Sequence, residues 1–97
     1  MARNSEIVRE PLAAATAACV LPATPDRVAV LLCAVLTGSI TWSNSGGVTA
    51  GDGIVLAAGA TPVALTRREH GDLVELAWYA FHTAGGVSAV AVQTVEL

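Results

Sequence analysis

The sequence predicts an all-β fold: a single-domain antiparallel β-sandwich or jelly-roll-like barrel of about seven to eight strands. Two observations predict it. From Pro22 onward, turn residues recur roughly every 8–12 residues, a spacing typical of sandwiches and barrels rather than of βαβ units. Between the turns lie short runs rich in valine, isoleucine and leucine, which favour strands. The 97 residues suffice for one compact domain.

The individual strands follow from these turns. "PATPD" precedes "RVAVLLCAVL", a run that is apolar on both faces, as in a buried central strand. "SITWS" alternates with period two and ends in the turn "NSGG". "LVELAWYAF" carries large residues on both faces, and "VSAVAVQTVEL" closes the chain. The expected strands therefore cover residues 27–36, 39–43, 53–58, 62–69, 72–81 and 87–96.

The N-terminal part of the chain is less regular. Residues 1–10 are polar and of mixed charge, so we expect an N-terminal arm, flexible or forming a short edge strand that becomes ordered against a partner. Residues 11–97 then make up the β-sandwich domain. Residues 11–21 are compatible with a helix that starts at Pro11 or with a strand of small residues.

A glycine-rich stretch, "GGVTAGDGIVLAAG", runs from Gly46 to Gly59. Glycine-rich loops that bind phosphate open a helix whose N-terminus faces the anion. Here the following residues are the strand formers "IVL", and neither a dinucleotide fingerprint nor a P-loop ending is present. These glycines are therefore expected to turn strands.

The composition limits the possible partners. The chain is 54% hydrophobic and only 13% charged, against about 25% charged in ordinary soluble domains, so we expect part of its surface to be covered by other chains. Its net charge of −3 and scattered arginines argue against nucleic-acid binding. No apolar run is long enough to cross a membrane. The first ten residues lack the features of a signal peptide, so we expect synthesis in the cytoplasm.

Few residues are candidates for chemistry. His70 beside Glu69 and Asp72 is the strongest metal or catalytic candidate, but a polar hairpin tip explains it more simply. His82 begins another turn. Cys19 and Cys33 have aliphatic flanks and are expected to be free, buried thiols. No nucleophile elbow is present. We therefore expect no enzyme, no catalytic residue, no cofactor and no metal site.

Four aromatic residues are the remaining site candidates. Trp42, Trp78, Tyr79 and Phe81 are expected to be core residues or anchors of a subunit interface. Trp78 in particular shares one strand face with other large apolar residues, as a structural anchor would. In the alternative interpretation, Trp42, Trp78 and Tyr79 line a carbohydrate or ligand site.

The order of these features resembles a diffuse group of small all-β phage virion proteins, which includes head-decoration and head-fibre-base proteins. The resemblance covers about residues 13–97. Its elements are the arginine-led strand at Arg27, the mid-chain "GDGIVLAAG" and a terminal strand that closes on Glu96. The sequence departs from the group's pattern near Cys33 and at Ala58, where small apolar residues replace the usual asparagine and proline.

The resemblance implies a non-enzymatic virion structural protein made in the host cytoplasm. It would be a capsid decoration or cement protein that binds the phage head as a homo-oligomer, a trimer by analogy, with the major capsid protein as its partner. The alternatives are a small ligand- or carbohydrate-binding β-domain and a structural protein of the tail or fibre base.

Overall fold

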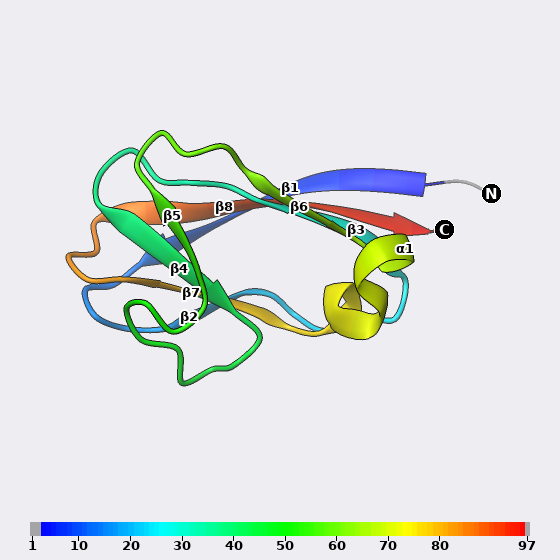
Figure 1. Ribbon diagram of the computed structural model, residues 1–97, viewed down its shortest axis with the longest axis horizontal. Coiled ribbons are helices and arrows are strands. Elements are labelled where there is room, and N and C mark those ends of the chain that lie inside the picture. Colours follow the sequence, from blue (N-terminus) through cyan, green and yellow to red (C-terminus); the bar gives the residue numbers. More distant parts are fainter. Residues whose placement is uncertain (1–2, 97) are drawn as a thin grey trace.

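The computed structural model describes residues 3–96 and consists of two four-stranded antiparallel sheets packed face to face (Figure 1). It confirms the all-β sandwich expected from the sequence. Sheet A has the spatial order β1-β8-β3-β6, and sheet B has the order β2-β7-β4-β5. A one-turn helix, α1 (Arg67–His70), and a 3-10 helix, η1 (Gly71–Glu75), join β6 to β7. The strands are β1 (Arg3–Leu12), β2 (Ala18–Leu21), β3 (Arg27–Leu32), β4 (Ser39–Ser43), β5 (Ile54–Ala57), β6 (Val63–Thr66), β7 (Trp78–His82) and β8 (Val87–Glu96).

The strand order is that of a jelly roll. The first half of the chain pairs with the second half in reverse order: β1 with β8, β2 with β7, β3 with β6 and β4 with β5. Such a paired ribbon, wound over itself, distributes its strands between two sheets. Of the two architectures expected from the sequence, the jelly roll therefore describes the connectivity.

The core lies between the sheets and follows the period-two alternation of the strands. In β4, Ile40 and Trp42 point inward and are fully buried. Alanines occupy inward positions of β7 and β8, as expected in a close-packed interior that must also hold two indole rings. The buried core residues are Leu12, Val20, Leu21, Val30, Leu32, Val35, Ile40, Trp42, Leu56, Leu65, Val74, Trp78, Ala80, Ala89 and Ala91.

The N-terminal stretch belongs to the sandwich. Residues 3–12 form β1, an edge strand of sheet A, which pairs with β8 without a bulge from Arg3↔Glu96 to Leu12↔Val87. The boundary expected after residue 10 lies inside this strand. In Figure 1, β1 and β8 extend past sheet B toward the end of the molecule where both chain ends lie, and the molecule measures 41 × 23 × 21 Å. Residues 11–21 contain the end of β1 and all of β2, so the strand alternative holds there.

The strand expected over residues 62–69 is too long. It ends at Thr66, whose Oγ1 accepts a hydrogen bond from the backbone N–H of Glu69 (3.3 Å) and caps α1. The Thr-x-x-Glu spacing is that of a capping box, a local signal that predicts this helix start. The strand expected over residues 27–36 likewise ends early, at Leu32.

The strand expected over residues 72–81 is wrong in its first half. Residues 71–75 form η1, and only residues 78–82 form β7. The physical reason is tertiary. In η1 the Val74 side chain is fully buried, while the carbonyl groups of Val74 and Leu76 accept hydrogen bonds from the buried Arg27. These contacts outweigh the β propensity of the segment.

The glycine-rich loop, residues 44–53, lies over the outer face of sheet B. Asn44 Nδ2 donates to the carbonyl oxygen of Ala77 (3.0 Å), and the Gly51 N–H donates to Thr41 Oγ1 (3.2 Å). Gly53 lies so close to the Trp42 carbonyl that a Cβ would overlap it, which explains the need for glycine there. A strand, β5, follows the loop rather than a helix, as predicted.

Candidate functional site

The four aromatic candidates do not form an exposed site. Trp42 and Trp78 lie within the core, fully buried, and Phe81 is buried as well. The Trp42 indole N–H donates to the Cys33 carbonyl oxygen (3.2 Å). Tyr79 is half-buried beside Gly46 of the glycine-rich loop. The two tryptophans therefore stabilise the fold and cannot present a surface to another molecule.

The two histidines have different environments. His70 is exposed at the end of α1, and its Nδ1 accepts a hydrogen bond from the Thr66 N–H (3.2 Å). His82, expected at a solvated turn, is buried instead. Its Nδ1 accepts from the Gly85 N–H (3.0 Å), which leaves Nε2–H to donate to the Thr37 carbonyl oxygen (2.8 Å). The neutral ring therefore links two loops and has no free nitrogen for catalysis.

The two cysteines are free thiols. Cys19, expected to be buried, is exposed on β2, because its register partner Tyr79 lies on the outer face of sheet B. Cys33 is half-buried, and burial raises the pKa of its thiol. Within residues 3–96, no group of three or more His, Cys, Asp or Glu side chains lies close enough to hold a metal ion.

Arg27 is the centre of a buried polar network, a role that sequence reasoning did not assign to it. The register of β3 against β8 shifts between Arg27 and Ala29, and this bulge turns Arg27 to the inner face. Its Nε–H donates to Gln93 Oε1 (3.0 Å), and Nη1 donates to the carbonyl oxygens of Val74 (3.1 Å) and Leu76 (3.0 Å).

The remaining donor group of Arg27, Nη2, donates to the Pro22 carbonyl oxygen. Burial lowers the pKa of Arg27, and the Coulombic interaction with Cys19 raises this pKa by a smaller amount. Only 1% of the Arg27 surface is exposed, so its hydrogen bonds form away from solvent. The guanidinium thus connects the β2–β3 turn, η1 and β8.

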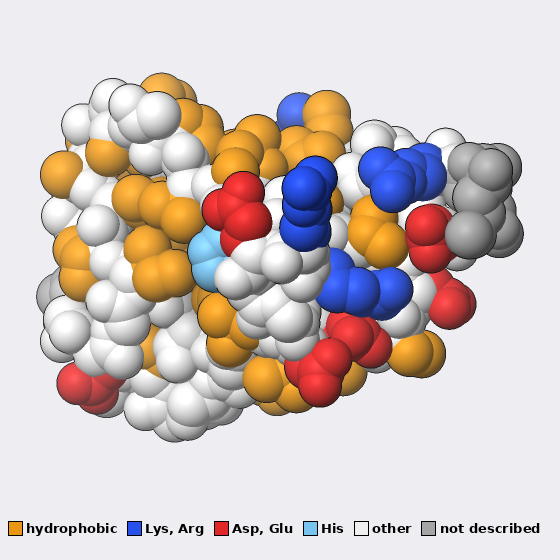
Figure 2. Space-filling view, turned by 45° about the vertical axis from the view of Figure 1, so that its right-hand side comes forward, with side chains coloured by type: hydrophobic (Ala, Val, Ile, Leu, Met, Phe, Trp, Pro, Cys, Tyr) orange, Lys and Arg blue, Asp and Glu red, His pale blue; other side chains and the backbone are white. Residues whose placement is uncertain are grey.

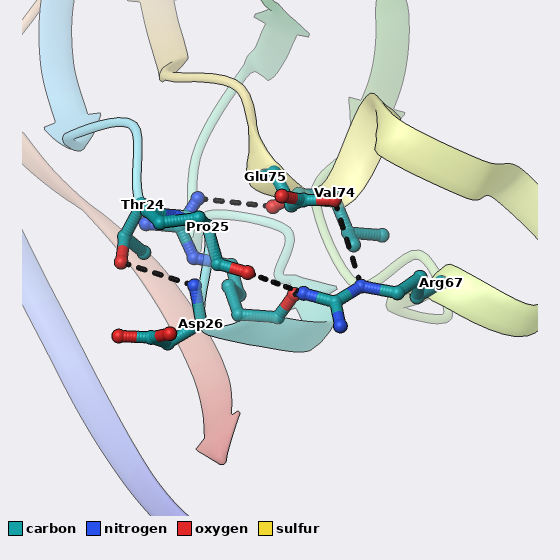
Figure 3. A network of polar contacts seen from close by, with 7 residues as sticks. Thr24, Pro25, Asp26, Arg67, Val74 and Glu75 are labelled. Atoms are coloured by element: carbon teal, nitrogen blue, oxygen red, sulfur yellow. Dashed lines mark hydrogen bonds and ion pairs between the residues drawn. The ribbon is translucent and has the colours of Figure 1, made fainter. Parts of the chain in front are cut away.

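Arg67 extends this network to the surface (Figure 3). Its Nη2 donates to the carbonyl oxygens of Pro25 and Arg27 (2.8 Å for Arg27), and its Nε lies 3.6 Å from Glu75 Oε2. The Thr24 N–H donates to the Glu75 carbonyl oxygen (2.9 Å). Arg67 is therefore engaged in holding α1 and η1 against the β2–β3 turn.

An open groove of about 720 Å³ lies beside α1 on the outer face of sheet A. Its rim carries charges of both signs, and Arg3 lies 3.9 Å from Glu96. On the face shown in Figure 2, most of the charged side chains gather from the centre toward the right-hand end, and the other end shows mainly hydrophobic and uncharged surface. The mixed signs differ from the concentrated positive patch that nucleic acids require. The groove is lined by Arg3, Val28, Ala29, Thr66, Arg67, Arg68, Glu69, Thr94 and Glu96.

The outer face of sheet A carries an uncovered apolar row. Ile7 pairs with Val92, Val92 with Leu31, and Leu31 with Ala64, so these four residues lie side by side across all four strands. The core includes a chain neighbour of each of the three members on β3, β6 and β8, and Val8, next to Ile7, packs against it, so alternation directs the four outward. These core neighbours are Val30, Leu32, Leu65 and Ala91. Ile7 is 55% exposed, Ala64 is exposed, and the other two are half-buried. We call these four residues the outer row.

The outer row was not predicted from the sequence, because its members come from four separate strands. The sequence shows which residues of one strand share a face, but it does not show which residues of neighbouring strands lie side by side.

Among the described residues, no helix is long and apolar enough to cross a membrane. The chain matches no protein-family model, and comparisons with curated proteins and with solved structures gave no match.

Proposed function

We propose that this protein is a non-enzymatic virion component, a decoration or cement protein that binds the outside of a phage head as a homo-oligomer. The observation that carries the proposal is the outer row, Ile7, Val92, Leu31 and Ala64. A sheet face that is apolar across four strands and that residues 3–96 leave uncovered is expected to be covered by association.

The architecture supports the proposal in combination with the sequence. Jelly rolls form viral capsid proteins as well as lectins, so the fold by itself assigns no function. The resemblance to phage virion proteins favours the first group. Such a protein works by burying apolar surface against its partner, and each Å² of apolar surface removed from water contributes about 25 cal/mol to the free energy of binding.

The mode of binding follows from the arrangement of the face. The outer row would supply the apolar contact with the major capsid protein. The groove rim beside it carries both arginines and glutamates, and such mixed charge fixes orientation more than it adds affinity. A tail or fibre-base protein would use the same surface on a different target.

The carbohydrate-binding alternative loses its main support. It required Trp42 and Trp78 to stack on a sugar, and both indoles are buried in the core. Tyr79 is the one member of that set with partial exposure, and it lies beside the glycine-rich loop.

The test is cosedimentation of the purified protein with phage capsids that lack it. Ala64→Glu places a charge in the outer row and should weaken binding at least about tenfold. Ala57→Glu is the matched control, because Ala57 is also an exposed alanine on a four-residue edge strand, in sheet B. Failure of the wild type to cosediment, or equal binding by both variants, would contradict the proposal.

A further inference from the structure

The strand β1 has a long free edge. Its ten residues pair with β8 on one side, and no strand of the described chain lies on the other side. Natural proteins protect such edges with charged side chains, above all lysine, with prolines and bulges, or by keeping the strand short. β1 carries four charged residues, Arg3, Glu6, Arg9 and Glu10, which hinder pairing wherever like signs would meet. β1 has no bulge, the chain contains no lysine, and the strand's one proline, Pro11, is next to its end. The other three edge strands, β2, β5 and β6, are only four residues long.

The hydrogen-bond pattern shows which backbone groups of β1 face this edge. The Cys33 N–H donates to the Val90 carbonyl oxygen in the β3–β8 register, so the even-numbered residues of β8 bond toward β3. Its odd-numbered residues then bond toward β1, where they oppose the even-numbered residues. The N–H and C=O groups of Arg3, Ser5, Ile7 and Arg9 are therefore directed at the free edge.

We infer that two copies of this chain pair through β1 about a twofold axis at Ile7. Antiparallel pairing around Ile7 places it opposite its own copy and Ser5 opposite the partner's Arg9. The odd-numbered residues of both strands then form the hydrogen-bonded pairs, as the free groups require. The Arg3 N–H also meets the partner's Pro11 carbonyl, which needs no N–H from proline.

The charges of β1 select this register over its neighbours. A twofold axis at Glu6 would place Glu6 opposite Glu6 and Arg3 opposite Arg9. An axis at Val8 would place Glu6 opposite Glu10, and one at Arg9 would pair that arginine with itself. Like charges directly opposite each other destabilise a strand pair. With the axis at Ile7, no like charges lie directly opposite. An axis at Ser5 also avoids them, but it pairs only residues 3–7 of the described strand, whereas the axis at Ile7 pairs residues 3–11.

The pairing would join two four-stranded sheets into one continuous sheet. The outer rows of the two copies would meet at Ile7 and form a single apolar band, doubling the surface offered to a capsid. This inference deepens the proposed function, on whose homo-oligomer it rests, by naming the contact between copies. The resemblance implies a trimer, which twofold pairing of one strand cannot form. The number of copies in the oligomer therefore distinguishes the β1-paired dimer from that trimer.

Proline substitution tests the edge without disturbing the fold. Ile7→Pro removes an N–H that faces the free edge, so self-association should weaken at least about tenfold. Its melting temperature should fall only by the part that dimerisation contributes, and should match that of the wild type at concentrations where the wild type is dissociated. Val8→Pro removes an N–H that bonds to β8 and should instead lower the melting temperature. Ile7→Val, which keeps the N–H, is the matched control. The mass of each variant is measured by native mass spectrometry and sedimentation velocity at micromolar concentration, where the wild type should show twice the 9.8 kDa chain mass.

Cysteine cross-linking tests the register. In a background with Cys19 and Cys33 replaced by alanine, Ile7→Cys should oxidise to a covalent dimer, since opposed residues lie about 5.5 Å apart between Cα atoms. Ser5→Cys and Arg9→Cys should each remain uncoupled alone and form a disulfide when mixed.

A monomeric wild type, a trimer, an oligomer unaffected by Ile7→Pro, or cross-links in another register would overturn the inference. A trimer that binds capsids would overturn the pairing and leave the proposed function standing. A monomer that binds capsids would overturn both the pairing and the homo-oligomer, and would leave only the capsid binding standing. A β1-paired dimer that does not bind capsids would support the pairing and contradict the proposed function.

Discussion

Replacement of Arg27 should be among the most destabilising single changes in this domain. Arg27→Met keeps much of the side-chain volume and removes every donor of the guanidinium. The carbonyl oxygens of Val74, Leu76 and Pro22 then lose a partner, as does Gln93. Each buried group left unsatisfied costs about 1–3 kcal/mol, and release of a desolvated charge offsets part of the sum. We expect a loss of about 3–5 kcal/mol in the free energy of unfolding.

The loss is measured by urea unfolding and by thermal melting. For a domain of this size, about 1 kcal/mol corresponds to 4–8 °C, so the melting temperature should fall by at least about 12 °C. Arg68→Met is the matched control, because Arg68 is exposed on α1 and should change stability by no more than about 0.5 kcal/mol. Arg27→Lys should also destabilise the fold, since one ammonium cannot reproduce the planar set of donors.

The reasoning would be refuted if Arg27→Met unfolded within about 1 kcal/mol of the wild type. That result would mean that the carbonyl groups of η1 and of the β2–β3 turn find other donors or water. It would also remove the physical reason given for the helical start of the 72–81 segment.

Three further predictions concern the thiols, the core and the turn before β8. The exposed Cys19 should react with iodoacetamide well before Cys33, because the raised pKa of Cys33 leaves less thiolate near pH 8. Because the folded protein favours the neutral Cys33 thiol, this contribution to the free energy of unfolding is present at neutral pH and is lost as the pH rises through the raised pKa. Trp78→Ala should cost about 3–5 kcal/mol, and Trp78→Phe less than half of that, because the buried indole N–H has no hydrogen-bond partner; equal melting temperatures would contradict this. Gly85→Ala should destabilise the protein far more than Gly86→Ala in denaturant titrations, since both have positive φ but a Cβ at Gly85 alone would overlap the backbone of the β1–β2 turn.

Local patterns determined most of the strands. The segment 39–43 alternates in polarity and ends in turn residues, and the structure has a strand with the same bounds. The final strand, 87–96, also coincides with its prediction. Both follow from β propensity and turn chemistry, which depend on residues close in sequence. The same local reasoning, applied to Thr66 and Glu69, predicts the start of α1.

Long-range contacts decided the rest. Arg27 is buried because a bulge turns it inward and because its acceptors Val74 and Leu76, 47 and 49 residues away, converge on it. The same contacts make the start of the 72–81 segment helical. The outer row exists only once the register sets Ile7 beside Val92. Alternation along one strand is a property of the sequence, but the pairing of strands is fixed by the packing of the whole domain, so the candidate interaction surface emerged only from the tertiary structure.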